Sequence, residues 1–199
     1  MEGEITMRAG QNGVTEKTPE KILFGAGTIH RGLKYTEGSG WNFEKTIVGA
    51  TSGGSKFSVK PEIKKIEIDG VYVNAKGLSE KTGETATMEL NLIELTPEII
   101  KAATFAKDGT SADAEYTLIE SKESIEEGDY WDNIAFVGKT LKGKHVIAIL
   151  DNALCTSGFE QEGKSKEGAV GKYTFESYAG LDSNLTTVPW HIYYPKASA

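Results

Sequence analysis

The chain has 199 residues, 38% of them hydrophobic, and its 29 acidic and 22 basic residues give a formal net charge of −7 at pH 7. This length suits one domain with a full hydrophobic core, and the acidic balance argues against a protein built to grip nucleic acid, which needs clustered lysine and arginine. The single cysteine, Cys155, excludes an intrachain disulfide and a cysteine-based metal cluster.

The first twenty residues are polar and predict an N-terminal arm (1–20), so residues 21–199 are expected to form a single domain. The start lacks the basic and apolar regions of a signal peptide, and no apolar run approaches the ~20 residues of a membrane span. We therefore expect a soluble protein made in a reducing cytoplasm, without a membrane partner.

Short alternating runs separated by turn residues predict many strands in the first half of the chain. The pair Asp69-Gly70 lies between two such runs and is typical of a tight hairpin, because glycine tolerates the positive φ that the turn demands. The predicted strands are Lys21–Phe24, Thr28–Tyr35, Trp41–Val48, Lys56–Lys60, Glu62–Asp69 and Val71–Lys76.

The clearest period of two lies in Thr85–Leu92. It predicts one buried face and one solvated face. The buried face is Ala86, Met88, Leu90 and Leu92, and the solvated face is Thr85, Thr87, Glu89 and Asn91.

One helix is expected directly after this strand. Thr96 is its predicted N-cap, Pro97 occupies the first turn, and Asp108-Gly109 is predicted to end it. The apolar face Ile99, Ala102, Ala103 and Ala106 is small enough to lie close to a sheet.

The second half returns to strands, and Glu160–Gly168 is predicted to be a surface loop. Because strands dominate and the helix occurs once, the sequence predicts a mainly β fold, a β-sandwich or barrel with one flanking α-helix. The predicted strands are Ala114–Ser121, Asn133–Val137, Lys144–Leu154, Val170–Ala179 and Val188–Tyr194.

Two glycine-rich segments were tested as nucleotide sites. In Gly49–Lys56 the lysine stands one place too late for a phosphate-binding loop, and a strand rather than a helix follows. Gly25-Ala26-Gly27 opens like a dinucleotide fingerprint, but His30 occupies the third glycine position. A flexible loop is the better interpretation of the first, so no cofactor is expected.

No catalytic or metal-binding residues are assigned, and no enzymatic activity is expected. The histidines His30, His145 and His191 are scattered, and Cys155 is expected to be a buried apolar residue. The acids between Glu115 and Asp129 fit a solvated face better than a glycosidase pair. The aromatics Trp131, Trp190, Tyr193 and Tyr194 fit core and interface positions better than a sugar platform.

Several segments together resemble the major tail tube proteins of long-tailed bacteriophages and related prophages. They follow the family's order along nearly the whole chain, and none is a catalytic signature. The segments are KILFGAGTIHRG, IVGATSGGSKFSVKPEIKKIEIDG, VYVNAKG, ELNLIELTPEIIKAA, YWDNIAFVGK, HVIAILDNALCTSG and VPWHIYYPK.

The resemblance implies a β-sandwich with a helix on its flank, six copies in a ring, and rings stacked into a hollow tube. DNA passes through such a tube without specific binding. The partners implied are further copies of the chain and the tape measure, tail terminator and tail-tip proteins. The implied location is the virion tail, with the host cytoplasm during assembly.

Under this resemblance, the polar face Thr85, Thr87, Glu89 and Asn91 is the candidate lumen surface, where acidic residues would repel DNA phosphates. The segment 36–54 is the candidate ring-stacking loop, expected to order on assembly. Its marker residues are Gly38, Gly40, Trp41, Gly49, Gly53 and Gly54.

Two alternatives stay open at this point. A monomeric β-sandwich binding module for carbohydrate or adhesion on a phage particle fits the aromatics near Trp190. A hydrolase using the acids of 115–129 or a dispersed histidine–aspartate set is the third hypothesis.

Overall fold

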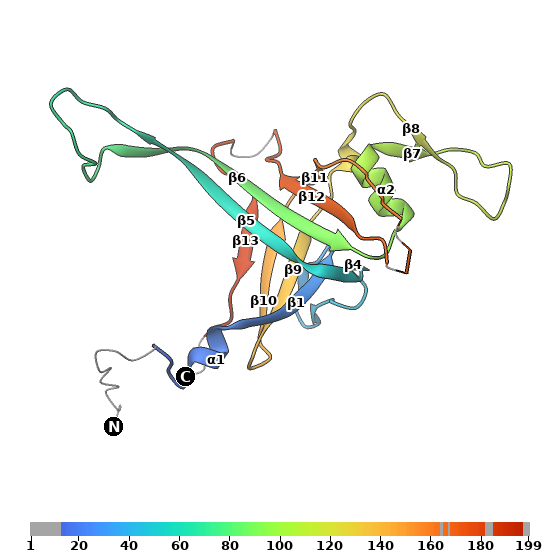
Figure 1. Cartoon of the computed structure of the whole chain (residues 1–199), viewed down its shortest axis with the longest axis horizontal. Coiled ribbons are helices and arrows are strands. Elements are labelled where there is room, and N and C mark those ends of the chain that lie inside the picture. The colour runs from blue at the N-terminus through green and yellow to red at the C-terminus, as the bar shows by residue number, and fades with distance from the viewer. Residues whose placement is uncertain (1–12, 164, 167, 182–184, 197–199) are drawn as a thin grey trace.

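The computed structural model describes residues 13–163, 165–166, 168–181 and 185–196. Two antiparallel sheets contain most of the strand residues in this part of the chain, with a helix at one end, and the predicted mainly β fold is confirmed (Figure 1). Of the predicted N-terminal arm, residues 1–12 lie outside the described part. Its remainder contains a short helix that the sequence did not predict, α1 (Thr18–Lys21).

The five-stranded sheet has the order β13 (Trp190–Tyr193), β10 (His145–Leu150), β9 (Ile134–Thr140), β1 (Leu23–His30) and β4 (Ile47–Gly49). The four-stranded sheet has the order β11 (Ala153–Cys155), β12 (Gly171–Ser177), β6 (Ser79–Leu92) and β5 (Thr51–Lys65). Two small hairpins complete the strands: β2 (Tyr35–Thr36) with β3 (Gly40–Trp41), and β7 (Ala106–Asp108) with β8 (Ile119–Ser121).

The core lies between the two sheets, and the period-two pattern of β6 defines one of its walls. Ala86, Met88, Leu90 and Leu92 are at most 2% exposed, which confirms the predicted buried face. Tyr173 and Phe175 of β12 continue this wall, and Ile29, Ile134 and Leu150 close the core from the other sheet.

Helix α2 (Pro97–Thr104) begins where the sequence predicts. The N–H of Ile99 donates to Thr96 Oγ1 at 3.4 Å, so Thr96 is the N-cap, and Ile99, Ala102 and Ala103 are buried. The predicted end at Asp108-Gly109 is wrong. Phe105 adopts a left-handed conformation with φ of 50° and stops the helix, after which the chain forms β7 and Ala106 becomes a strand residue.

The predicted strand Val71–Lys76 is wrong, although its turn is correct. The Val71 N–H donates to the carbonyl of Ile68, and Gly70 has φ of 83°, so Asp69-Gly70 does form a β-turn. The ladder instead pairs β5 with β6, from Thr51 opposite Leu92 to Lys65 opposite Ser79. The alternating residues beyond Lys65 therefore have neither a partner strand nor a core to face.

Other predicted strands are shorter or divided, including Thr28–Tyr35, which stops at His30 and resumes at Tyr35, and Glu62–Asp69, which stops at Lys65. Trp41–Val48 contributes only the end of β3 and the start of β4, and Ala114–Ser121 contributes only β8. Lys144–Leu154 is divided at Asn152, whose φ of 46° turns the chain from the five-stranded sheet into the four-stranded sheet. The change of sheet lets one apolar run supply both walls of the core.

Candidate assembly surface

A long hairpin leaves the sandwich where β5 and β6 continue past the other strands (Figure 1). All residues from Lys60 to Lys65 are exposed, yet they stay paired with β6 up to the Lys65–Ser79 pair. The ladder continues beyond the sandwich, with a bulge between Glu62 and Ile63, so this hairpin projects from the body. We call residues 60–84 the arm.

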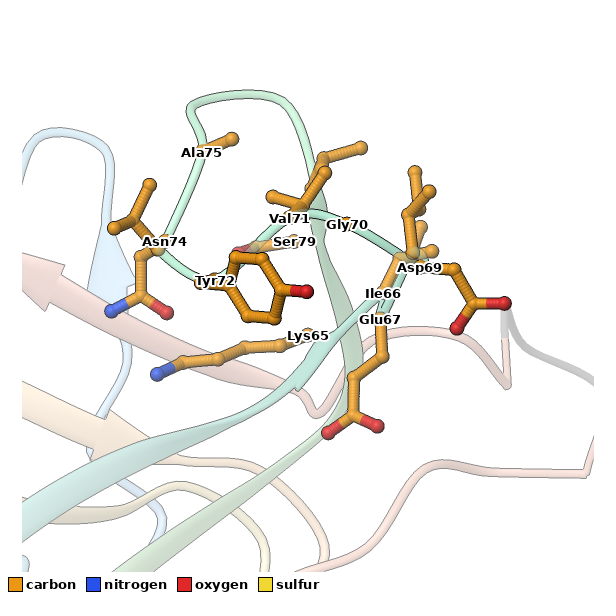
Figure 2. Close-up of a pocket in the computed structure, with 13 residues that line it drawn as sticks. Lys65, Ile66, Glu67, Asp69, Gly70, Val71, Tyr72, Asn74, Ala75 and Ser79 are labelled. Atoms are coloured by element: carbon orange, nitrogen blue, oxygen red, sulfur yellow. The ribbon is translucent and has the colours of Figure 1, made fainter.

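The end of the arm exposes large apolar side chains. Tyr72 is 95% exposed and Val73 is 78% exposed, and Ile66, Ile68 and Val71 are also exposed. Figure 2 shows the loop from Lys65 to Ser79, with Glu67 and Asp69 projecting to one side and Lys65 and Asn74 to the other. We call residues 66–75 the tip. The tip surrounds a hollow of about 950 Å³ that is lined almost entirely by its own exposed residues, so no rigid wall is available to hold a ligand.

Strand β5 lies at the edge of the four-stranded sheet, so backbone N–H and C=O groups on one of its sides have no partner strand among the described residues. Its backbone pairs with β6 on one side, and no backbone hydrogen bond on its other side is found within the described residues. A bulge between Thr51 and Ser55, with Gly53 and Gly54 at φ of 83°, bends the strand near its start. An unpaired edge of this length invites pairing with another chain.

The segment 36–54 is built mainly from secondary structure. Gly38 and Gly40 have positive φ and form the turn between β2 and β3. The Trp41 ring packs edge-on against Tyr193 at 4.9 Å between centroids, Gly49 ends β4, and Gly53 and Gly54 belong to β5. The predicted stacking loop therefore contains parts of four strands, β2 to β5, in the single chain. Its ordering on assembly stays a prediction.

The polar residues of β6 lie where the alternation places them, on the outer face of the four-stranded sheet. Glu89 is exposed and its carboxylate lies 2.7 Å from the ammonium of Lys56, while Asn91 donates to the carbonyl of Gly54 at 3.0 Å. Thr85 and Thr87 are half-buried beside β5.

The outer face of this sheet carries charges of both signs and is not acidic. The charged residues in register on it are Lys56, Lys60 and Lys172 against Glu62, Glu89 and Glu176, which gives three positive and three negative charges. This face therefore lacks the acidic surface expected to repel DNA phosphates, and it is polar with balanced charges.

A groove lies between β1, β9 and the segment after β3. It has a volume of about 400 Å³, and the exposed side chains of Phe24 and Ile47 border it. Lys139, His145 and Glu44 are its charged or titratable lining residues besides His30. The remaining lining residues are Gly27, Thr28, His30, Phe43 and Val137.

The His30 side chain links β1 to the segment that follows β3 through a hydrogen bond with Thr46. The imidazole is 1% exposed, with Nε2 2.8 Å from Thr28 Oγ1 and Nδ1 2.9 Å from Thr46 Oγ1. Thr46 Oγ1 donates to the carbonyl of Asn42, so it accepts from Nδ1–H, and Nε2 accepts from Thr28. Burial lowers the pKa of His30 because the charged ring loses solvation, partly opposed by a hydrogen bond with the Phe43 backbone.

The other histidines and the cysteine do not assemble with His30 into one site. His145 lies beside Phe43 on the exposed side of the groove, and His191 lies on β13 with Nε2 2.8 Å from Asp151. Cys155 is 1% exposed, and burial raises the pKa of its thiol, which confirms the expected buried apolar role. Among the described residues no group of three or more potential metal ligands is found.

The acids of 115–129 include a local structural cluster. Lys122 Nζ lies 2.7 Å from Asp129 and 3.1 Å from Glu126, and the Glu126 N–H donates to Asp129. These bonds cap the short 3₁₀ turn Glu127–Asp129. Glu126 and Asp129 therefore stabilise this turn.

The aromatic residues divide between core and surface. Trp131 is 3% exposed, and Trp190 packs on the core with Nε1 donating to Glu84 at 2.8 Å. Tyr193 and Tyr194 are about half exposed. Tyr193 contacts Trp41, which in turn contacts Tyr35, so the surface aromatics form a small cluster beside β13.

Sequence reasoning missed both the arm and the groove. The alternation of Glu62–Asp69 and Val71–Lys76 resembles half-buried strands, so exposure of these residues was not expected. No signal in the sequence indicated the arm, because its exposure depends on how far β5 and β6 stay paired beyond the other strands.

Comparison with models of protein families gave no match. Comparison with curated proteins gave no match either. Within the described part of the chain, no helix has the length and apolar character needed to cross a membrane.

Proposed function

We propose that this protein is a structural subunit that assembles with copies of itself into stacked hexameric rings, forming the tube of a phage tail through which DNA passes. The arm supports this proposal more than any other feature. A projecting hairpin that exposes Tyr72, Val73 and three more large apolar side chains is unfavourable in a chain that stays alone in water.

Two further features support self-assembly. The free edge of β5 offers a ladder that a neighbouring copy can complete, and closing a ring satisfies such edges. The charge-balanced outer face of β5, β6 and β12 suits a lining that neither holds nor strongly repels a polyanion, since counterion release needs clustered lysine and arginine.

In this proposal the ring forms through sheet edges, and the tail proteins expected as partners are the tape measure, terminator and tip proteins. The particle is the virion tail, assembled in the host cytoplasm.

The experiment is a concentration series of the purified chain by sedimentation velocity. The proposal requires a reversible shift from one chain to a ring-sized particle, and a constant single-chain mass at every concentration contradicts it.

A second candidate function is a monomeric carbohydrate or adhesion module. The observation that favours it is the surface aromatic cluster of Tyr35, Trp41 and Tyr193, since such rings can stack on sugars. Glycan binding that is lost in Trp41→Ala, together with a single-chain mass, would favour this function over the tube.

A further inference from the structure

We propose that the tip of the arm docks into the groove of a second copy, with the segment 42–47 and β1 as its walls. This inference rests on the proposed self-assembly and assigns its two contacting surfaces. Both surfaces are apolar, and both are open in the single chain.

The apolar parts match in kind. The tip presents Tyr72 and Val73 almost fully exposed, and the groove presents Phe24, Phe43 and Ile47 around about 400 Å³ of space. A tyrosine gains from a site that covers its ring and leaves its hydroxyl at a wet margin, and this groove is open to solvent.

The charges are complementary. Between Lys65 and Lys76 the tip contains two acids, Glu67 and Asp69, and no base. Lys139 of β9 lines the groove, and Lys142 lies three residues further along the chain, in the turn that follows β9. Lys144 lies in the same turn, but its ammonium already donates to the carbonyl of Lys196. Glu44 is the acidic residue that lines the groove, and it belongs to the same chain segment as Phe43 and Ile47.

A chain cannot fill its own groove with its own tip. The β5–β6 ladder continues as far as the Lys65–Ser79 pair and extends the arm away from the sandwich, and the tip and the β9–β10 turn lie at separate ends of the molecule (Figure 1). An apolar projection that fits a pocket elsewhere on the same molecule makes a head-to-tail contact. Such contacts extend from copy to copy and produce rings or open filaments. The groove wall belongs to 36–54, so this contact gives the predicted stacking segment a binding partner.

The first test is site-directed crosslinking in the assembled full chain. Tyr72→Cys and Ile47→Cys, made in separate chains and mixed, are expected to give a disulfide-linked dimer under mild oxidation. Tyr116→Cys is the matched control, because Tyr116 is also highly exposed but lies on the loop between β7 and β8. Equal crosslinking of Tyr116→Cys and Tyr72→Cys to Ile47→Cys would overturn the docking.

The second test is charge reversal. Glu67→Lys with Asp69→Lys, and separately Lys139→Glu with Lys142→Glu, are each expected to raise the critical concentration for long assemblies by about tenfold or more. A chain with all four changes is expected to recover most of the loss. All changed side chains are at the surface, so folding is retained and is checked by circular dichroism.

The outcomes separate the two proposals. If the unaltered chain assembles and neither pair of reversals changes its critical concentration, the docking is wrong while the tube function stands. If the unaltered chain remains single at all concentrations, the tube function is wrong and the docking falls with it.

Discussion

Individual buried polar groups differ sharply in how well they are satisfied. Ser177 Oγ lies 2.7 Å from the carbonyl of Asp151 and 2.8 Å from that of Pro189. Ser55 Oγ is buried and has no hydrogen-bond partner within the described chain. A buried hydroxyl without a partner costs free energy, whereas a satisfied one contributes to stability.

The two serines therefore respond oppositely to alanine. Ser55→Ala is expected to leave the free energy of unfolding unchanged or raise it by up to about 1 kcal/mol, and Ser177→Ala to lower it by about 1 kcal/mol. Urea unfolding below the assembly concentration measures both. A larger loss from Ser55→Ala than from Ser177→Ala would contradict the assignment.

His30 makes the stability of the monomer depend on pH. Its pKa is lower in the folded protein than in the unfolded chain, so the unfolded state binds more protons below the ordinary histidine value of 6.5. The contribution of His30 is complete above pH 6.5 and is lost as the pH falls through the lowered pKa. We expect His30→Gln to reduce the loss of unfolding free energy between pH 7 and about pH 5.

Urea unfolding at pH 7 and at about pH 5 measures this, with the unaltered chain as the reference. Unchanged pH dependence in His30→Gln would show that its protonation is not linked to folding.

Among the secondary-structure elements, the sequence predicted those features that depend on a single chain segment. The buried face of β6 follows from period two, and the start of α2 follows from Thr96 and Pro97. Register and partner choice depend on distant segments, so the pairing of β5 with β6 and the divided run 144–154 were not predictable. The groove was equally inaccessible, because Phe24, Phe43 and Lys139 meet only after β1 and β9 pair.

The arm is expected to contribute to assembly and little to folding. Replacing residues 66–78 with Asn-Gly closes the hairpin directly after the Lys65–Ser79 pair with a favoured two-residue turn. The midpoint of thermal unfolding should change by less than about 2 °C, since the removed residues are almost all exposed. Calorimetry at low concentration measures this, and failure to fold would place the tip in the monomer's core.

The shortened chain also separates two kinds of contact. If sheet edges form the ring and the tip joins rings, this variant keeps the ring-sized particle and loses long assemblies. Loss of the ring-sized particle as well would assign the tip to the lateral contact.

At the scale of the molecule, the lining proposed for the tube is neutral through balanced charges. Glu62→Lys with Glu89→Lys changes the outer face of β5, β6 and β12 from three charges of each sign to five positive and one negative. The assembled variant should retain DNA at about 50 mM salt and release it at about 200 mM. Binding through phosphate contacts is driven by counterion release, so its affinity falls as the salt concentration rises. A filter-binding assay with the unaltered assembly as reference measures this, and equal retention by both would remove this face from the lumen.

The central claim is that copies of this chain complete each other's exposed surfaces in a closed, repeating particle. Negative-stain electron microscopy of the concentrated full chain, with the 66–78 replacement beside it, tests that claim most directly. The account predicts hollow tubes of one width for the unaltered chain and short rings for the replacement. Single sandwich-sized particles at every concentration of the unaltered chain would contradict it.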